Sequence, residues 1–358
     1  MGFRISRAMK QLEAAFPVDS QLLMVLPRAG ASVRNPDVRL PILRSDVNGY
    51  YLEMRVEADA QDDSEFAVIR RVPLENLSEE YAKLDWETCV RKGVSNGLEK
   101  VDDRRIQRMF MALMTFLNPR QISIVLYLYK LAAQQQNGGT VTFRSNDLLE
   151  SLGYTRTKDG GFASKLRSQL NRDLVALHRT ELVLAQSFRM NQNRGAKVMI
   201  KSILRIKDYE VDSAPRDFDI TKAADYTYEL ADSYTISLEF FDGSRNGDCV
   251  LFPNQFDITQ RLGSNAKCDY KTKLLIYLAS RMKWDSLTDG QYISVSKQYL
   301  FKNLDLFGSN SSRNNQIFWR TVDELKGDGY LLGAQELSGK SRISTIQFQI
   351  DSTKLKCK

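Results

Sequence analysis

The fold of this chain is decided by the stretch FASKLRSQLNRDLVALHRT at residues 162–180. Its apolar residues recur at the spacing that lines one side of an α-helix. The predicted buried stripe contains Phe162, Leu166, Leu170, Leu174 and Leu177. The opposite side carries Lys165, Arg167, Ser168, Asn171 and Arg172. We therefore expect an amphipathic helix that packs on a core and presents a basic face.

The segments around this helix complete a recognisable unit. After it we predict two strands, LVLAQSF (182–188) and AKVMIKSILRI (196–206), joined by the basic hairpin tip RMNQNRG (189–195). Before it we predict a helix that begins at Pro119, a strand TVTF (140–143) and a helix capped by Ser145. This is the element order of a winged helix, in which the third helix enters the major groove of DNA and the hairpin contacts the flanking backbone.

The same order of elements recurs nearer the C-terminus. Helices are predicted within 271–284, 297–308 (capped by Ser296) and 311–330, and strands at 291–295, 331–335 and 341–350. The segment RDLVALHRTELVLAQ (172–186) aligns with TVDELKGDGYLLGAQ (321–335) at an offset of 149 residues. LYLYKLA (126–132) aligns with LIYLASR (275–281) at the same offset. A shared order at a shared offset indicates internal duplication.

These patterns predict an α+β protein with two tandem winged-helix domains, at 104–210 and 230–352, after an α+β region of uncertain fold at 1–103. The elements expected outside the two repeats are a surface helix within 1–16, strands at 21–26, 50–56 and 66–72, and a helix at 104–117. A hairpin of 234–242 and 249–256 is expected to join the second sheet or to bridge the two copies.

The charge of the chain is concentrated in one segment. Residues 154–207 hold 12 Lys and Arg against the acids Asp159, Asp173 and Glu181. The local charge is therefore +9 in a chain of net charge +7, which leaves −2 for the rest. A basic segment in a nearly neutral remainder is typical of a face that binds a polyanion, although a solvated face without a partner stays open.

Catalytic chemistry is missing from the sequence. One histidine, His178, cannot build a two-histidine metal site, and acid pairs such as Asp62–Asp63 lie in predicted polar loops. We expect no enzymatic activity, no metal and no cofactor. Four widely spaced cysteines are typical of reduced thiols in a cytoplasmic protein. No apolar run has the length of a membrane span, so we expect no membrane partner.

Three segments resemble the plasmid replication initiators that carry two winged-helix domains in pseudo-symmetric tandem. The segments are LNPRQISIVLYLYKLA (117–132), YTISLEFF (234–241), and KTKLLIYLASRM (271–282) followed by YISVSKQYLFKNLDL (292–306). The resemblance covers about residues 104–350. It implies sequence-specific binding to repeated sites (iterons) at a replication origin, host helicase and initiator proteins as partners, and an equilibrium between initiating monomers and repressing homodimers.

Two other functions stay open. A transcriptional or segregation regulator with the same modules would bind one palindrome instead of direct repeats. A protein-interaction module would show nucleic-acid binding that barely depends on salt, because phosphate neutralisation makes affinity fall with salt. The resemblance implies that the C-terminal module dominates DNA binding, whereas the excess positive charge here lies in the first module.

The predicted DNA-binding residues lie in the third helix, the loop before it and the hairpin tip of each copy. In the first copy they are Arg156, Lys158, Lys165, Arg167, Ser168, Asn171, Arg172, Arg189, Arg194 and Lys197. In the second copy they are Arg313, Asn314, Asn315, Gln316, Arg320, Lys340 and Arg342. Arginine suits paired hydrogen bonds to guanine, and asparagine or glutamine suits adenine.

Overall fold

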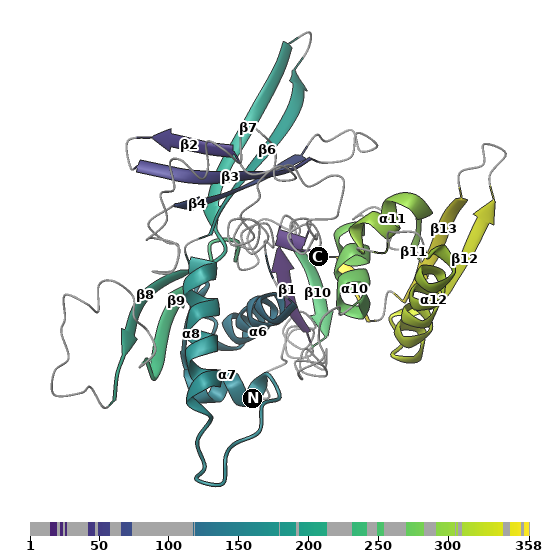
Figure 1. The fold of residues 1–358 in the computed structure, drawn as a ribbon. Helices are drawn as coiled ribbons and strands as arrows, with labels where there is room; N and C mark the ends of the chain where they lie inside the picture. Colours follow the sequence, from purple (N-terminus) through teal and green to yellow (C-terminus); the bar gives the residue numbers. More distant parts are fainter. Residues whose placement is uncertain are drawn as a thin grey trace, which may run out of the picture.

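A computed structural model describes most of the two repeats and parts of the N-terminal region. The described residues are 15–19, 22–23, 26, 42–46, 49–57, 66–73, 117, 119–178, 180–190, 193–212, 231–241, 249–253, 270–282, 291–304, 306, 310–338, 344–351 and 354–357. They form helices and small antiparallel sheets, which is an α+β arrangement (Figure 1).

The first repeat has the helices that the sequence predicts and the first of its two predicted hairpin strands. Its elements are α6 (Pro119–Gln135), β5 (Thr140–Arg144), α7 (Ser145–Ser151), α8 (Ser164–His178), β6 (Glu181–Met190) and β7 (Asn193–Ser202). Proline begins α6 because the first helical turn needs no amide donor at that position. The predicted cap at Ser145 is wrong: Arg144 is the N-cap residue, and the Ser145 hydroxyl donates to the Ala231 carbonyl at 3.1 Å.

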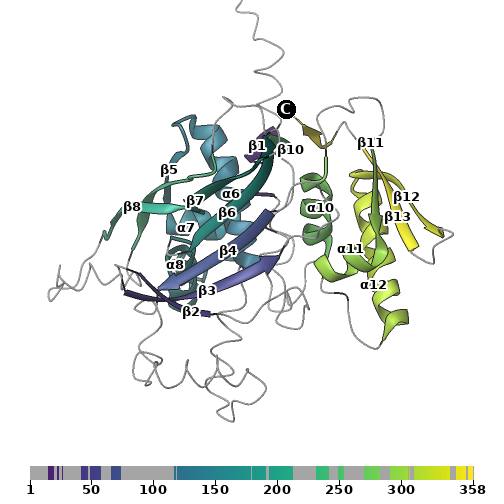
Figure 2. The ribbon, with the colours of Figure 1, turned by 90° about the horizontal axis from the view of Figure 1, so that it is seen from above.

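The second repeat has the predicted order too. It consists of α10 (Tyr270–Ser280), β11 (Gln291–Ser296), α11 (Lys297–Asn303), α12 (Ser311–Gly327), β12 (Leu331–Ser338) and β13 (Ser344–Ile350). The strands form an antiparallel sheet of order β11-β13-β12. Alternate residues of β13 are buried, and the Phe348 ring lies 6.3 Å from the Phe318 ring of α12. Both views show this repeat to one side of the rest (Figure 2).

The strands of the first repeat pair differently. β6 lies between β7 and β4 (Phe66–Pro73), in a sheet of order β2-β3-β4-β6-β7 with β2 (Ile42–Asp46) and β3 (Gly49–Glu57). One sheet therefore contains strands of the N-terminal region and of the first repeat. The strands predicted at 50–56 and 66–72 are confirmed as β3 and β4.

The predicted strand at 196–206 is two strands. β7 ends at Ser202, and β8 (Arg205–Glu210) enters another sheet of order β5-β9-β8 with β9 (Ser233–Ser237). The successive residues Ser202, Ile203 and Leu204 are all buried. Because a strand alternates its faces, three buried residues in a row mark the point where the chain leaves one sheet for the other.

Three further expectations are wrong. β9 and β10 (Cys249–Pro253) do not form a hairpin, because β10 pairs with β1 (Ala15–Asp19) and β14 (Lys356–Cys357). The end of the expected N-terminal helix is strand β1, in which Phe16 and Val18 are buried alternately. Residues 22, 23 and 26, expected in a strand, are helical, and the Asp19 carboxylate accepts a hydrogen bond from the Leu22 amide at 3.1 Å in the manner of an N-cap residue. The helix expected at 104–117 lies outside the described residues except for Leu117.

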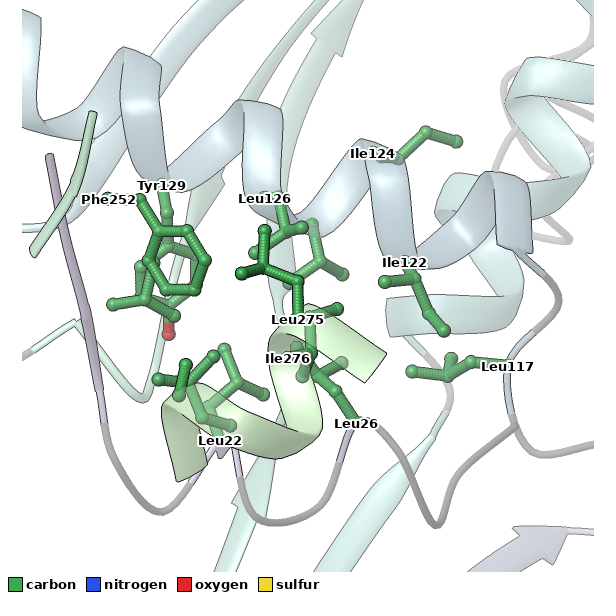
Figure 3. Packing of buried hydrophobic residues seen from close by; sticks show 14 of the residues in the cluster. Leu22, Leu26, Leu117, Ile122, Ile124, Leu126, Tyr129, Phe252, Leu275 and Ile276 are labelled. Atoms are coloured by element: carbon green, nitrogen blue, oxygen red, sulfur yellow. The ribbon is translucent and has the colours of Figure 1, made fainter. Parts of the chain in front are cut away.

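One hydrophobic core is shared by the two repeats. Leu126 and Tyr129 of α6 and Leu275 and Ile276 of α10 are fully or almost fully buried in the same cluster. Their side chains lie between the two helices, together with Leu22, Leu26 and Phe252 (Figure 3). Burying one such side chain contributes about 1.5–3 kcal/mol, so the two repeats stabilise each other.

Burial also refines the alignment of the repeats. The buried residues Leu170, Asp173, Leu174 and Leu177 of α8 correspond to Phe318, Thr321, Val322 and Leu325 of α12. This match has an offset of 148 residues rather than 149. The following strands keep the predicted offset of 149, as the buried pair Leu182 and Leu331 shows. The connection from α12 to β12 is therefore one residue longer than the connection from α8 to β6.

Candidate nucleic-acid interface

The exposed face of α8 is formed by residues one helical turn apart. Lys165, Gln169 and Arg172 are exposed at positions i, i+4 and i+7. Lys165 and Arg172 were predicted to be DNA-binding residues. Gln169 is exposed on the same face, at the helical spacing of i+4 from Lys165. This face combines two cations with an amide that can pair with a base edge.

Two of the predicted DNA-binding residues form contacts within the protein. Asn171 is 2% exposed, and its side-chain oxygen accepts a hydrogen bond of 2.8 Å from the Tyr234 hydroxyl. Arg167 is half-buried and forms an ion pair with Asp232, just before β9. Both residues therefore join α8 to the sheet that contains β9. Ser168 lies between the two faces and is half-buried.

The loop between α7 and α8 is shaped by Arg156. Its guanidinium pairs with Glu150, donates to the Gly160 carbonyl at 3.0 Å and lies 5.3 Å from the centre of the Phe162 ring. The hydrogen bond and the charge of Glu150 raise the pKa of Arg156. Lys158 is exposed in the same loop. Of these two predicted residues, Arg156 would have to give up its contacts with Glu150 and Gly160 to bind a phosphate, whereas Lys158 is exposed.

The predicted wing of the first repeat is the β6–β7 hairpin. Its pairing runs from Glu181 opposite Ser202 to Met190 opposite Asn193, and it places Arg189 opposite Arg194 near the tip. Lys197 is exposed on β7. In the second repeat the predicted wing residues Lys340 and Arg342 lie outside the described residues.

The exposed face of α12 begins directly after a capped end. Asn310 caps the helix, since its side-chain oxygen accepts a hydrogen bond from the Arg313 amide at 3.0 Å. Arg313, Gln316 and Arg320 are exposed at positions i, i+3 and i+7, opposite the buried stripe. Arg320 is 72% exposed and lies 3.8 Å from Glu324. The predicted residues Asn314 and Asn315 are half-buried and flank this face.

The cations on the exposed faces of α8 and α12 match at the offset that burial defines. Lys165 corresponds to Arg313 and Arg172 to Arg320, whereas the exposed Gln316 corresponds to the half-buried Ser168. Each helix therefore carries a cation at the same two places, about two turns apart, on the side away from the core. The structure brings these pairs into register, which the sequence offset alone does not.

Some of the positive charge of the first repeat is neutralised by ion pairs within the protein. Arg156, Arg167 and Arg205 pair with Glu150, Asp232 and Glu239, which all lie outside residues 154–207. Including these carboxylates lowers the local charge from +9 to +6. The difference in charge between the two repeats is accordingly smaller than composition indicates.

A buried ion pair beneath α8 is structural. Arg120 of α6 pairs with Asp173 of α8, and Gln121 donates to the same carboxylate at 3.2 Å. Burial lowers the pKa of Arg120, but the hydrogen bond and charge of Asp173 outweigh it, so the pKa is raised. Among the described residues no group of His, Cys, Asp or Glu could hold a metal ion. Within the same residues no helix is long and apolar enough to cross a membrane.

Comparison with known proteins finds only distant likeness. No family model and no curated protein sequence matches the chain. A selenomethionine derivative of domains 2 and 3 of RctB superposes with a TM-score of 0.45 and 12% identity, over 93% of this chain and 97% of that one. A second structure of RctB domains 2–3 superposes with a TM-score of 0.39 and 13% identity, over 91% of this chain and 96% of that one.

Proposed function

We propose that this protein binds double-stranded DNA in a sequence-specific manner through two winged-helix units. The observation that carries the proposal is the repeated pair of exposed cations, Lys165 and Arg172 on α8 and Arg313 and Arg320 on α12. A helix of this kind can place the N-terminal half against base edges while its cations contact phosphates.

The order of elements supports the same proposal. In the second repeat a helix, a strand and two further helices precede a hairpin, and the first strand pairs with the last one. This is the order in which a winged helix presents its third helix and its wing. In the first repeat the hairpin is present, but its strand β6 is also bound to β4.

We further propose that the DNA sites are direct repeats at a replication origin, as the resemblance to plasmid initiators implies. Two linked helices that each recognise a few base pairs gain affinity through effective concentration. A regulator with the same modules is the second candidate. Genomic fragments recovered with the protein and sequenced would separate the two, because direct repeats favour the initiator and one palindrome favours the regulator.

Matched double variants test DNA binding itself. Arg172→Ala/Arg320→Ala changes the proposed interface, and Lys207→Ala/Lys354→Ala removes the same charge from exposed positions outside both helices. We expect the first variant to weaken binding by about 1–3 kcal/mol for each arginine that contacts a base, or to lower the salt slope by about one for each phosphate contact. The second variant should bind as the wild type does. Equal loss in both variants would contradict the proposed interface.

A further inference from the structure

The two repeats differ at one strand edge. In the first repeat β4 covers β6 from Glu181 to Gln186. The corresponding strand of the second repeat, β12, is the last strand of its sheet, and no described strand pairs with its other edge. The two strands have similar sequences, LVLAQ (182–186) and LLGAQ (331–335). The second repeat therefore presents an edge that its duplicate keeps covered.

The uncovered strand also exposes large apolar side chains. Leu332 is 57% exposed and Leu337 is 42% exposed. β12 lies at the outer side of the molecule in both views (Figures 1 and 2). A bulge at Leu332 interrupts the ladder near one end, but pairing with β13 is regular from Gly333 to Ser338. An edge with free backbone groups and exposed apolar residues is a template for another strand.

We propose that the β12 edge binds an extended segment of a partner protein, antiparallel to β12, as β4 is bound to β6. At the strand offset of 149, a partner residue would lie opposite Leu332 as Ile69 lies opposite Val183. Backbone hydrogen bonds would supply affinity, and alternate side chains would supply selectivity. This site is separate from the exposed face of α12 and goes beyond the proposed binding of DNA.

The chemistry of the partner segment follows from β4, the strand that covers the duplicate edge. β4 has the sequence FAVIRRVP, an apolar run followed by two arginines, with Arg71 opposite Glu181. The corresponding end of β12 follows Asp328, which pairs with Lys271, and lies beside Asp351, whose amide donates to the Tyr330 carbonyl at 3.0 Å. We therefore expect a segment with an aliphatic run followed by basic residues, as in β4.

A labelled peptide with the sequence SEFAVIRRVPLE, copied from residues 64–75, is the probe. Fluorescence anisotropy with the full chain should show saturable binding. Leu332→Lys should weaken it at least about tenfold, because a lysine on an edge strand opposes pairing. Val198→Lys is the matched control, since Val198 is also 57% exposed and lies on the edge strand β7 of another sheet. This control should bind the peptide as the wild type does.

Two peptides that are N-methylated at alternate amides separate strand pairing from apolar contact. Because alternate amides of a strand point to opposite sides, one peptide should keep its affinity and the other should lose it. Equal binding of both peptides, or unchanged binding by Leu332→Lys, would overturn the proposal. Sedimentation of the protein alone adds a further test: a dimer that Leu332→Lys dissociates would show that a second copy of this chain occupies the edge, which would also overturn it.

Discussion

The hydroxyl group of Tyr234 in β9 donates a hydrogen bond of 2.8 Å to the side-chain oxygen of Asn171, on the buried side of α8. We expect Tyr234→Phe to lower the free energy of unfolding by about 0.5–1.5 kcal/mol, because a buried acceptor loses this donor. Urea denaturation measures the loss. DNA affinity at a temperature where the variant is folded should not change. A changed base preference would contradict a purely structural role of Asn171 and indicate that it contacts DNA.

Arg167 and Arg172 lie on the same helix but have different roles. Arg167→Ala should destabilise the fold, because Asp232 loses its ion-pair partner, and should leave the salt dependence of DNA binding unchanged. Arg172→Ala should change the stability of the fold less than Arg167→Ala does. It should lower the salt slope of DNA binding by about one if Arg172 contacts a phosphate. Thermal unfolding and titrations at several salt concentrations measure both effects. An equal effect of the two substitutions on DNA binding would contradict this division.

Base preference should depend on the first half of α12. Arg313→Ala/Gln316→Ala should relax selection at a few adjacent base pairs, by about 1–3 kcal/mol for each lost paired contact. Non-specific affinity should fall much less, because phosphate contacts elsewhere supply most of it. Selection from a random DNA pool measures the preference, with Asp323→Ala on the same helix as the control. The same selected motif from variant and wild type would exclude α12 from base recognition.

The Glu336 carboxylate links β12 to the start of α11. Hydrogen bonds from Lys297, at 2.9 and 2.8 Å, and from Ser344 lower the pKa of Glu336 below its ordinary value of 4.5. This contribution to stability is therefore present above the pKa of the unfolded chain and lost as pH falls through the folded pKa. Glu336→Gln should cost up to about 1 kcal/mol at neutral pH, because the pair is partly exposed. Urea denaturation should show no difference between variant and wild type at a pH below the pKa of Glu336 in both the folded and the unfolded chain. A difference that persists in acid would mean that packing, and not charge, is responsible.

The shared core predicts that neither repeat folds alone. A chain that ends near residue 215 lacks β9, which pairs with β5 and β8, and lacks α10, whose Leu275 packs in the core with Leu126. We expect this fragment to lack a cooperative unfolding transition. In the full chain, Leu275→Ala should lower the free energy of unfolding by about 2–5 kcal/mol in a single transition. Two separate transitions, or a cooperative fragment, would show that the repeats are independent.

Local structure follows from the sequence more closely than strand pairing does. Helical spacing predicts α6, α8, α10 and α12, and a proline marks the first residue of α6. Partners of strands are a long-range property, and nothing in LVLAQSF (182–188) indicates that β4 will pair with it. The same reason explains why β10 was expected beside β9 and instead joins the two ends of the chain, β1 and β14.

The sequence predicts some residues of the candidate interface correctly as exposed and others not. Spacing from the apolar stripe identifies Lys165, Arg172, Arg313 and Gln316, which are exposed. It does not identify Asn171 as buried, because the sheet that covers this residue includes β9, far along the chain. A polar residue at the border of a helix face becomes exposed or buried according to what packs beside it, and that is decided outside the helix.

The common core of α6 and α10 has a mechanical consequence for the proposed binding of DNA. Because Leu126 and Leu275 are buried in one cluster, α8 and α12 cannot change their separation without exposing apolar surface to water. Bending a duplex of roughly 20–30 bp by roughly 40–90° costs only about 1–6 kcal/mol. In the proposed complex the DNA should therefore deform more readily than the protein. Sites whose intervening base pairs twist or kink easily should be bound more tightly than rigid ones, even though no side chain touches those base pairs.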